Sequence, residues 1–136
     1  MSKIVVAFDG SETALRALRY AMKIADEIHL VNAQPKIDAP ALSLHMTRPD
    51  IDNMQFEQGR AVLAEACKVL DEGGVRYHTH LEIGEPASTI AQVAKSQSAD
   101  MIVMGTRGMG AFGNLIFGST VTKVVHLADV PVTLIK

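Results

Sequence analysis

The residues with the clearest chemical potential lie in one glycine-rich stretch near the C-terminus. Five of the ten glycines fall between Gly105 and Gly118, and Ser119 and Thr120 follow directly. Glycine is favoured where the backbone takes a positive φ or approaches a ligand closely. If a helix begins at Gly118-Ser119-Thr120, its unpaired N–H groups and the positive end of its dipole can hold a phosphate, with both hydroxyls as further donors. A loop followed by an ordinary serine helix cap is the alternative.

Two known phosphate-binding motifs match this stretch only in part. The segment Gly108-Met109-Gly110-Ala111-Phe112-Gly113 fits G-x-G-x-x-G, but the dinucleotide fingerprint needs these glycines at the turn of the first βαβ unit. Residues 113–120 resemble a P-loop, but Ser119 stands where the phosphate-binding lysine should be. The sequence therefore argues against both a dinucleotide fingerprint and P-loop phosphoryl transfer.

Strand-like and helix-like segments alternate along the whole chain. The expected strands are residues 4–8, 28–33, 75–83, 101–105 and 130–135. Four helices are expected: the first begins at Ser11, the second follows a long loop over residues 34–50, the third begins at Pro86 and the fourth at Ser119. The first and fourth strands are continuous apolar runs, which are typical of strands buried on both faces. The third strand alternates apolar and polar residues, which is typical of a strand with one wet face near a sheet edge.

This order predicts an α/β fold, an open five-stranded parallel sheet with helices on both faces. Because the first and fourth strands are the most apolar, we expect them side by side at the centre, where the winding direction reverses. Ligands of such sheets bind beyond the carboxyl ends of the strands at this reversal. The topology therefore points to Asp9-Gly10-Ser11 and to the residues that follow Gly105, before any motif is invoked.

Composition and charge narrow the class of protein. The chain has 136 residues, of which 48% are hydrophobic and 21% charged, so we expect one globular domain over residues 1–136. A net charge of −2 argues against non-specific electrostatic binding to nucleic acid or to an anionic membrane. The single cysteine, Cys67, excludes an internal disulfide and a cysteine-rich zinc site. No segment reads as a signal peptide or a bilayer-spanning helix, so we expect a cytoplasmic protein.

The spacing Gly105-x2-Gly108-x9-Gly118-Ser119 resembles the signature of the universal stress protein family, in its ATP-binding branch. The resemblance covers the whole chain. It includes the segments Asp9-Gly10-Ser11-Glu12, Leu30-Val31-Asn32-Ala33, Gly84-Glu85-Pro86, residues 100–105 and Val130-Pro131-Val132. It implies one universal stress protein domain over residues 1–136, with the Rossmann-like strand order 3-2-1-4-5 of the adenine nucleotide alpha hydrolase-like folds.

The resemblance also implies a nucleotide site and the residues that line it. These residues are Ala7, Phe8, Asp9, Ala33, Met104, Gly105, Gly108, Gly118, Ser119 and Thr120. Ala7 and Asp9 would border the adenosine, and Ala33 would offer backbone contacts to the adenine; Phe8 stands where many relatives have a smaller or polar residue. Met104, Gly105 and Gly108 would line the ribose and phosphates. Gly118, Ser119 and Thr120 would cradle the phosphates. Asp9 could bond the ribose or help to hold a phosphate-bound Mg or Mn ion.

Two of the polar candidates keep a second interpretation. Asp9 could be a turn former ahead of the first helix. Arg107, which we add from its chemistry alone, could neutralise a phosphate or make a surface ion pair.

The function we expect is that of a regulatory stress-response protein that binds ATP, ADP or AMP. A good phosphoryl-transfer catalyst needs a placed metal, charge-neutralising side chains and a group that positions the nucleophile, and no such base is evident here. A weak ATPase or an adenylate-forming enzyme of the same adenine-binding group is the alternative. A nucleotide-free interaction module is a third hypothesis, against which the intact glycine motif argues. The sequence does not name a downstream partner.

Two further features suggest a metal site and an interface. His78 and His80 share one strand face and could form a metal pair, but no third ligand is evident. The last strand carries Val132 and Leu134 with no following segment to cover it, and an apolar edge strand invites pairing with another copy. Relatives commonly dimerise there, so we expect a homodimer through residues 130–136.

Overall fold

The fold is seen in a computed structural model that describes residues 2–37, 46–106 and 118–136. Within these residues, strands and helices alternate as the sequence predicts. They are β1 (Lys3–Ala7), α1 (Glu12–Ile24), β2 (Glu27–Gln34), α3 (Arg48–Gly73), β3 (Arg76–Ile83), α4 (Pro86–Ser96), β4 (Met101–Gly105), α5 (Ser119–Leu127) and β5 (Val132–Ile135). None of these helices combines the length and apolar character that crossing a bilayer requires.

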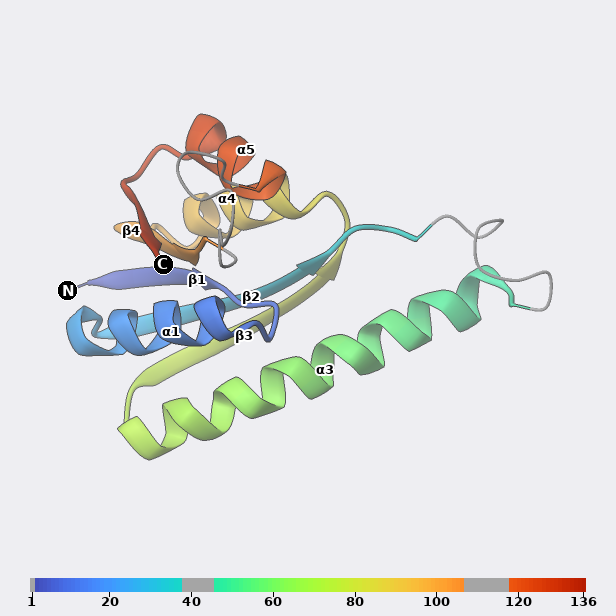
Figure 1. Cartoon of the computed structure of the whole chain (residues 1–136), viewed down its shortest axis with the longest axis horizontal. Helices are drawn as coiled ribbons and strands as arrows, with labels where there is room; N and C mark the ends of the chain where they lie inside the picture. Colours follow the sequence, from blue (N-terminus) through green and yellow to red (C-terminus); the bar gives the residue numbers. More distant parts are fainter. Residues whose placement is uncertain (1, 38–45, 107–117) are drawn as a thin grey trace.

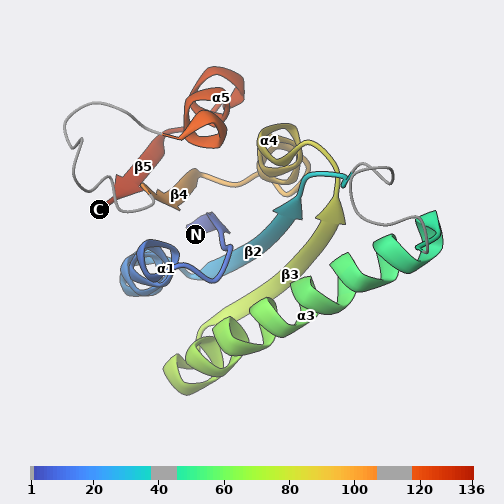
Figure 2. The same ribbon diagram turned by 45° about the vertical axis from the view of Figure 1, so that its right-hand side comes forward.

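The five strands form one parallel sheet in the order β3-β2-β1-β4-β5, which confirms the predicted fold class. Helices α1 and α3 cover one face of this sheet, and α4 and α5 cover the other (Figures 1 and 2). The two apolar strands β1 and β4 lie side by side at the centre, with Ile4 opposite Met101 and Val6 opposite Val103. The reversal of winding therefore falls between them, at the predicted place.

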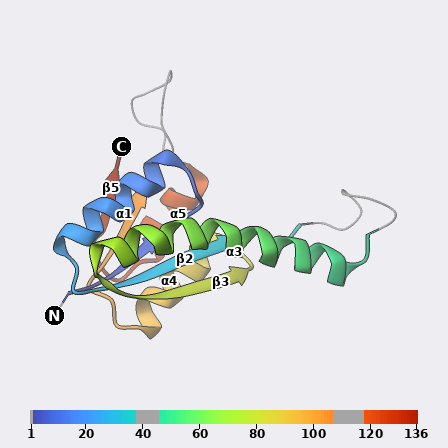
Figure 3. The same cartoon turned by 90° about the horizontal axis from the view of Figure 1, so that it is seen from below.

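A hydrophobic core lies on each face of the sheet. On the face of α1 and α3, Val6, Leu18 and Leu70 are fully buried, and these two helices are the ones seen in front of the sheet in Figure 3. On the other face, Val5, Ile102 and Val124 are fully buried under α4 and α5. Because successive residues of β1 enter opposite cores, a continuous apolar run is what this strand requires.

The predicted loop over residues 34–50 is too long at both ends. Strand β2 continues through Gln34, and α3 begins at Arg48. The side chain of Thr47 accepts a hydrogen bond from the Asp50 N–H (3.2 Å), and the Asp50 carboxylate accepts one from the Thr47 N–H (3.2 Å), which forms a capping box. Pro49 favours a loop in the sequence pattern, but the first turn of a helix tolerates proline because its N–H would have no partner there.

Gly105 ends β4 at a point where α1 passes very close. A Cβ atom at this position would lie 2.6 Å from the carbonyl carbon and 2.7 Å from the carbonyl oxygen of Thr13. These are backbone atoms, which cannot move aside as the end of a side chain can. The absence of a side chain at Gly105 therefore lets α1 pack on the central strands, whatever else the residue contacts.

We expect Gly105→Ala to destabilise the fold by about 1–3 kcal/mol, because the α1 backbone must shift to accept the methyl group. Urea unfolding followed by circular dichroism measures this change. Gly84→Ala is the matched control, since its Cβ would meet only the Thr89 Oγ1, at an ordinary 3.7 Å. Equal stabilities for the two variants would contradict the packing role of Gly105.

Candidate functional site

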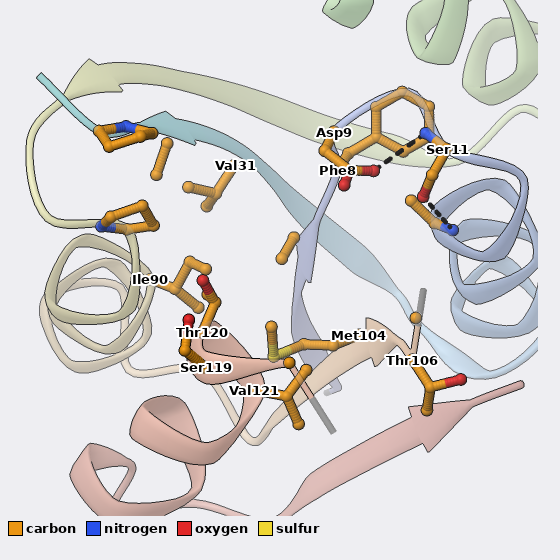
Figure 4. A pocket seen from close by; sticks show the side chains of 17 residues that line it. Phe8, Asp9, Ser11, Val31, Ile90, Met104, Thr106, Ser119, Thr120 and Val121 are labelled. Carbon is orange, nitrogen blue, oxygen red and sulfur yellow. Dashed lines mark hydrogen bonds between the residues drawn. The ribbon is translucent and has the colours of Figure 1, made fainter. Parts of the chain in front are cut away.

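A cavity of about 340 Å³ opens at the carboxyl ends of β1, β2 and β4, where α4 and α5 begin. This volume lies within the range of roughly 300–1,000 Å³ that is usual for small-molecule sites. Its position is the crevice beside the reversal of winding, where open α/β sheets bind their ligands. The residues that line it are Ala7, Phe8, Asp9, Ser11, Ala14, Val31, Ala33, Pro35, Pro86, Ile90, Met104, Gly105, Thr106, Gly118, Ser119, Thr120 and Val121 (Figure 4).

Every predicted site residue in the described part of the chain lines this one cavity. They come from four separate segments: Ala7, Phe8 and Asp9 at the end of β1, Ala33 in β2, Met104 and Gly105 in β4, and Gly118, Ser119 and Thr120 at the start of α5. Two other predicted residues, Arg107 and Gly108, lie outside the described residues.

One side of the cavity is apolar. Val31 and Ala33 face it from alternate positions of β2, and Ile90 faces it one turn beyond Pro86 in α4. In Figure 4, Val31 and Ile90 lie on the same side of the space, across from Asp9. Val31 and Ile90 are almost fully buried, with 1% and 3% of their surface exposed. This side can therefore take a flat apolar group such as an aromatic ring.

The N-terminus of α5 forms a polar side of the same cavity. Its N-cap is Gly118, which makes no side-chain capping bond, and the first intrahelical bond runs from the Thr122 N–H to the Gly118 carbonyl (3.1 Å). The N–H groups of residues 119–121 therefore have no acceptor within the helix. Ser119 is the first helical residue rather than the cap, so the ordinary serine cap considered from the sequence is not what the structure contains.

The other described helices differ from α5 at this point. Side-chain oxygens of Ser11, Thr47 and Glu85 cap α1, α3 and α4, respectively. Glu85 accepts a hydrogen bond from the Ser88 N–H (2.6 Å), and this bond, together with Lys123, lowers the pKa of its carboxyl group. The N-terminus of α4 is thus already supplied with a carboxylate, whereas that of α5 has no side-chain cap among the described residues.

Asp9 forms the predicted turn and also lines the cavity. Its Oδ1 accepts a hydrogen bond from the Ser11 N–H (2.9 Å), which is the turn-forming role. The residue is also exposed and lines the cavity, with its carboxylate drawn toward the open space in Figure 4. The turn therefore holds a carboxylate at the rim, where it can meet a cation or a hydroxyl group.

Phe8 and Met104 contribute differently from the glycines. The ring of Phe8 is buried in the core on the face of α1 and α3, and its N–H and carbonyl bond to the Val31 carbonyl (2.8 Å) and the Asn32 side chain (2.9 Å). Met104 is buried in the core on the opposite face and borders the cavity from below in Figure 4. Phe8 thus fixes the distance between β1 and β2 at the rim, and Met104 forms part of the floor.

The site residues named from the sequence do not include several lining residues, namely Ser11, Ala14, Val31, Pro35, Pro86, Ile90, Thr106 and Val121, although the topology already pointed to Ser11 and Thr106. Most of them are apolar and carry no chemical signal of their own. Val31 and Pro86 stand within segments that resemble the family, but only the folded chain shows that both face the cavity. The helical pattern of apolar residues indicates that Ile90 faces inward, but it does not show which part of the fold α4 covers.

His78 and His80, which the sequence suggests as a metal pair, have His29 as a third histidine beside them, but the described residues do not form a metal site. His29 of β2 lies against both: its ring stacks on that of His78 at 5.0 Å, and its Nδ1 lies 3.0 Å from the Nε2 of His80. Across the described residues, however, no group of three or more histidine, cysteine, aspartate or glutamate side chains has an arrangement that could hold a metal ion.

Comparison with known proteins decides the family. The profile of the Universal stress protein family matches residues 1–136. The chain belongs to the universal stress protein family. Curated members from Methanocaldococcus jannaschii and Thermus aquaticus are 33% and 36% identical to it; each alignment covers 98% of this chain, and 81% and 97% of the respective relative.

The universal stress protein of Archaeoglobus fulgidus has been solved in complex with dAMP. That structure is 26% identical to this chain, covers 100% of it and 98% of its own length, and superposes with a TM-score of 0.73. The sheet order and the helices of this universal stress protein therefore follow those of its relatives.

Proposed function

We propose that this universal stress protein binds an adenine nucleotide, ATP first among the candidates, and acts as a regulatory factor in a stress response. The observation that carries the proposal is the N-terminus of α5, which has no side-chain cap and borders a cavity that also has apolar lining. A nucleotide has two parts that match this lining: a flat base at one end and charged phosphates at the other. The dAMP complex of the Archaeoglobus fulgidus relative supports the ligand class.

The phosphates would bind at the start of α5. The amides of Ser119, Thr120 and Val121 have no acceptor within the helix, and the helix dipole favours an anion at that end. The Ser119 and Thr120 hydroxyls are further donors from the same turn. Asp9 is the charged side chain among the described lining residues, and a carboxylate near phosphates favours a shared Mg or Mn ion.

The adenine ring would lie against Val31, Ala33 and Ile90. These side chains offer an apolar surface without hydrogen-bonding groups, so the polar edge of the base would have to be read by the backbone, Ala33 included. The ribose would then lie between Ala7 and Met104. Gly105 would border the ribose too, although its packing against α1 already requires glycine there.

Binding rather than turnover is the function that the described lining favours. It contains no lysine, arginine or histidine that could stabilise a leaving phosphate or position an attacking water. A weak ATPase or adenylate-forming activity has no such observation in its favour. The nucleotide would therefore act as a regulatory ligand, and multiple-turnover release of phosphate would argue for the enzyme instead.

We expect Thr120→Glu to weaken nucleotide binding at least tenfold, because it places a carboxylate among the phosphates. Isothermal titration with AMP, ADP and ATP, each with and without Mg²⁺, measures the effect. Thr122→Glu is the matched control: Thr122 lies in the same first turn and is exposed, but it does not line the cavity. Both substitutions add an acidic residue where the helix dipole favours one, so neither should unfold the protein.

Two outcomes of this titration would contradict the proposal. One is the absence of binding heat for every adenine nucleotide with the unaltered protein. The other is an equal loss of affinity in the two variants, since phosphates held at the cavity side of α5 must distinguish residue 120 from residue 122.

We also propose that the protein is a homodimer through the open edge of β5, within residues 130–136. Ile102 of β4 donates its N–H to the Pro131 carbonyl, and Thr106, the residue after β4, donates its N–H to the Ile135 carbonyl, at 2.9 Å each. Successive residues of a strand direct their backbone groups to alternate edges, so residues 132 and 134 direct theirs away from β4. Such an edge can pair with the same strand of a second copy.

Light scattering at tens of micromolar protein is expected to give the mass of a dimer. Leu134→Pro should give a monomer, because it removes an outward N–H while the β4 bonds of the neighbouring residues remain. Leu134→Ala, which trims the same side chain and keeps the N–H, should stay dimeric. A monomeric unaltered protein, or a dimeric proline variant, would exclude pairing through this edge.

A further inference from the structure

Four polar side chains meet on the sheet face that carries α4, and none of them lines the cavity. Glu27 and His29 of β2 are 8% and 2% exposed, and the His29 Nε2 lies 2.8 Å from a Glu27 carboxylate oxygen. The other ring nitrogen of His29, Nδ1, lies 3.0 Å from the Nε2 of His80 on β3. The exposed His78 stacks on His29, with their ring centroids 5.0 Å apart. We call Glu27, His29, His78 and His80 the histidine cluster.

The bonds of the histidine cluster limit how many protons it can hold. The hydrogen bond from His29 lowers the pKa of Glu27, so its carboxylate is charged near neutral pH and accepts from the His29 Nε2–H. Between His29 Nδ1 and His80 Nε2, one nitrogen must donate and the other accept. One added proton on either ring preserves this bond. A second added proton would set two N–H groups against each other and break it.

The charges around the histidine cluster do not remove this limit. Lys3 of β1 and Arg76 of β3 lie near Glu27, while Glu82 of β3 attracts a proton to His80. The buried side chains of α4, which packs over β1 and β2, are apolar, and its Lys95 is exposed. Burial, followed by the positive charges of His29 and His78, nevertheless lowers the pKa of His80.

Strand β3 depends on these contacts more than the central strands do. It lies at the edge of the sheet and, among the described strands, pairs only with β2, His78 opposite His29 and His80 opposite Val31. No residue of the strand is fully buried, although α3 packs on its other face. Edge segments with little buried surface open locally at a lower free-energy cost than the core.

We propose that the histidine cluster is an acid-sensitive latch that holds edge strand β3 on β2 and releases it when a second proton enters. Because His80 is harder to protonate in the folded protein than in an open strand, the closed state is favoured above the ordinary histidine pKa of about 6.5 and loses its advantage as the pH falls below it. Each excluded proton shifts the open-to-closed ratio by up to about tenfold per pH unit in that window. This inference does not depend on whether the cavity binds a nucleotide.

Amide hydrogen exchange of the whole protein at pH 7 and pH 5, corrected for intrinsic exchange rates, tests the latch. Protection of the β3 amides should fall at least tenfold between these values, while protection of the β1 amides changes less. His80→Gln should remove this difference, since its amide can still donate to His29 Nδ1 but cannot take a proton. His126→Gln, an exposed histidine of α5, is the matched control and should keep the acid response.

A measurement on the unaltered protein keeps the test decisive if His80→Gln fails to fold. A ¹⁵N NMR titration of the imidazole nitrogens should show one proton entering the His29–His80 pair before β3 opens and the second entering with the opening. Equal β3 protection at pH 7 and pH 5, or two protons taken up by a strand that stays closed, would overturn the proposal.

Discussion

The pairing of β1 with β4 is the constraint on which the rest of the structure depends. It joins residues about one hundred positions apart, and both strands must be apolar on each face because a core lies on each side. Helix α1, which follows β1, lies on one face of the sheet, and α5, the next described helix after β4, lies on the other (Figure 1). The cavity lies at the carboxyl ends of these strands, so the site is a consequence of strand order rather than of a single motif.

Within that crevice, the division of polar and apolar surface follows from how the helices begin. Three helices have their first N–H groups satisfied by a serine, threonine or glutamate side chain, whereas α5 begins at a glycine. Within the described residues no side chain caps the first amides of α5, and an anion that binds to them gains hydrogen bonds and the favourable end of the helix dipole. Val31 and Ile90, which belong to the core on the face of α4 and α5, supply apolar lining to the same cavity. A ligand with one charged and one flat apolar end satisfies both.

Apolar runs in the sequence predict the central strands, because such runs are visible in one dimension. The resemblance to the family, which rests on the glycine spacing and on short segments along the chain, implies the strand order and the described glycine and hydroxyl residues that line the cavity. The sequence fails where the information is three-dimensional. Pro49 marks a loop by composition but belongs to a helix start, and the close approach of the Thr13 backbone requires glycine at position 105. His29 lies in a predicted strand whose pattern does not show that His78 and His80 come to rest beside it. The apolar lining residues Val31 and Ile90 are of the same types as the rest of the core, so only their place in the fold distinguishes them.

The most direct test of the central claim is a crystal structure of this protein grown with an adenine nucleotide. The account predicts phosphate oxygens within hydrogen-bonding distance of the backbone N–H groups of residues 119–121, with the base against Val31 and Ala33. A nucleotide bound at another surface, with the space between Asp9 and Ser119 filled by water alone, would contradict it.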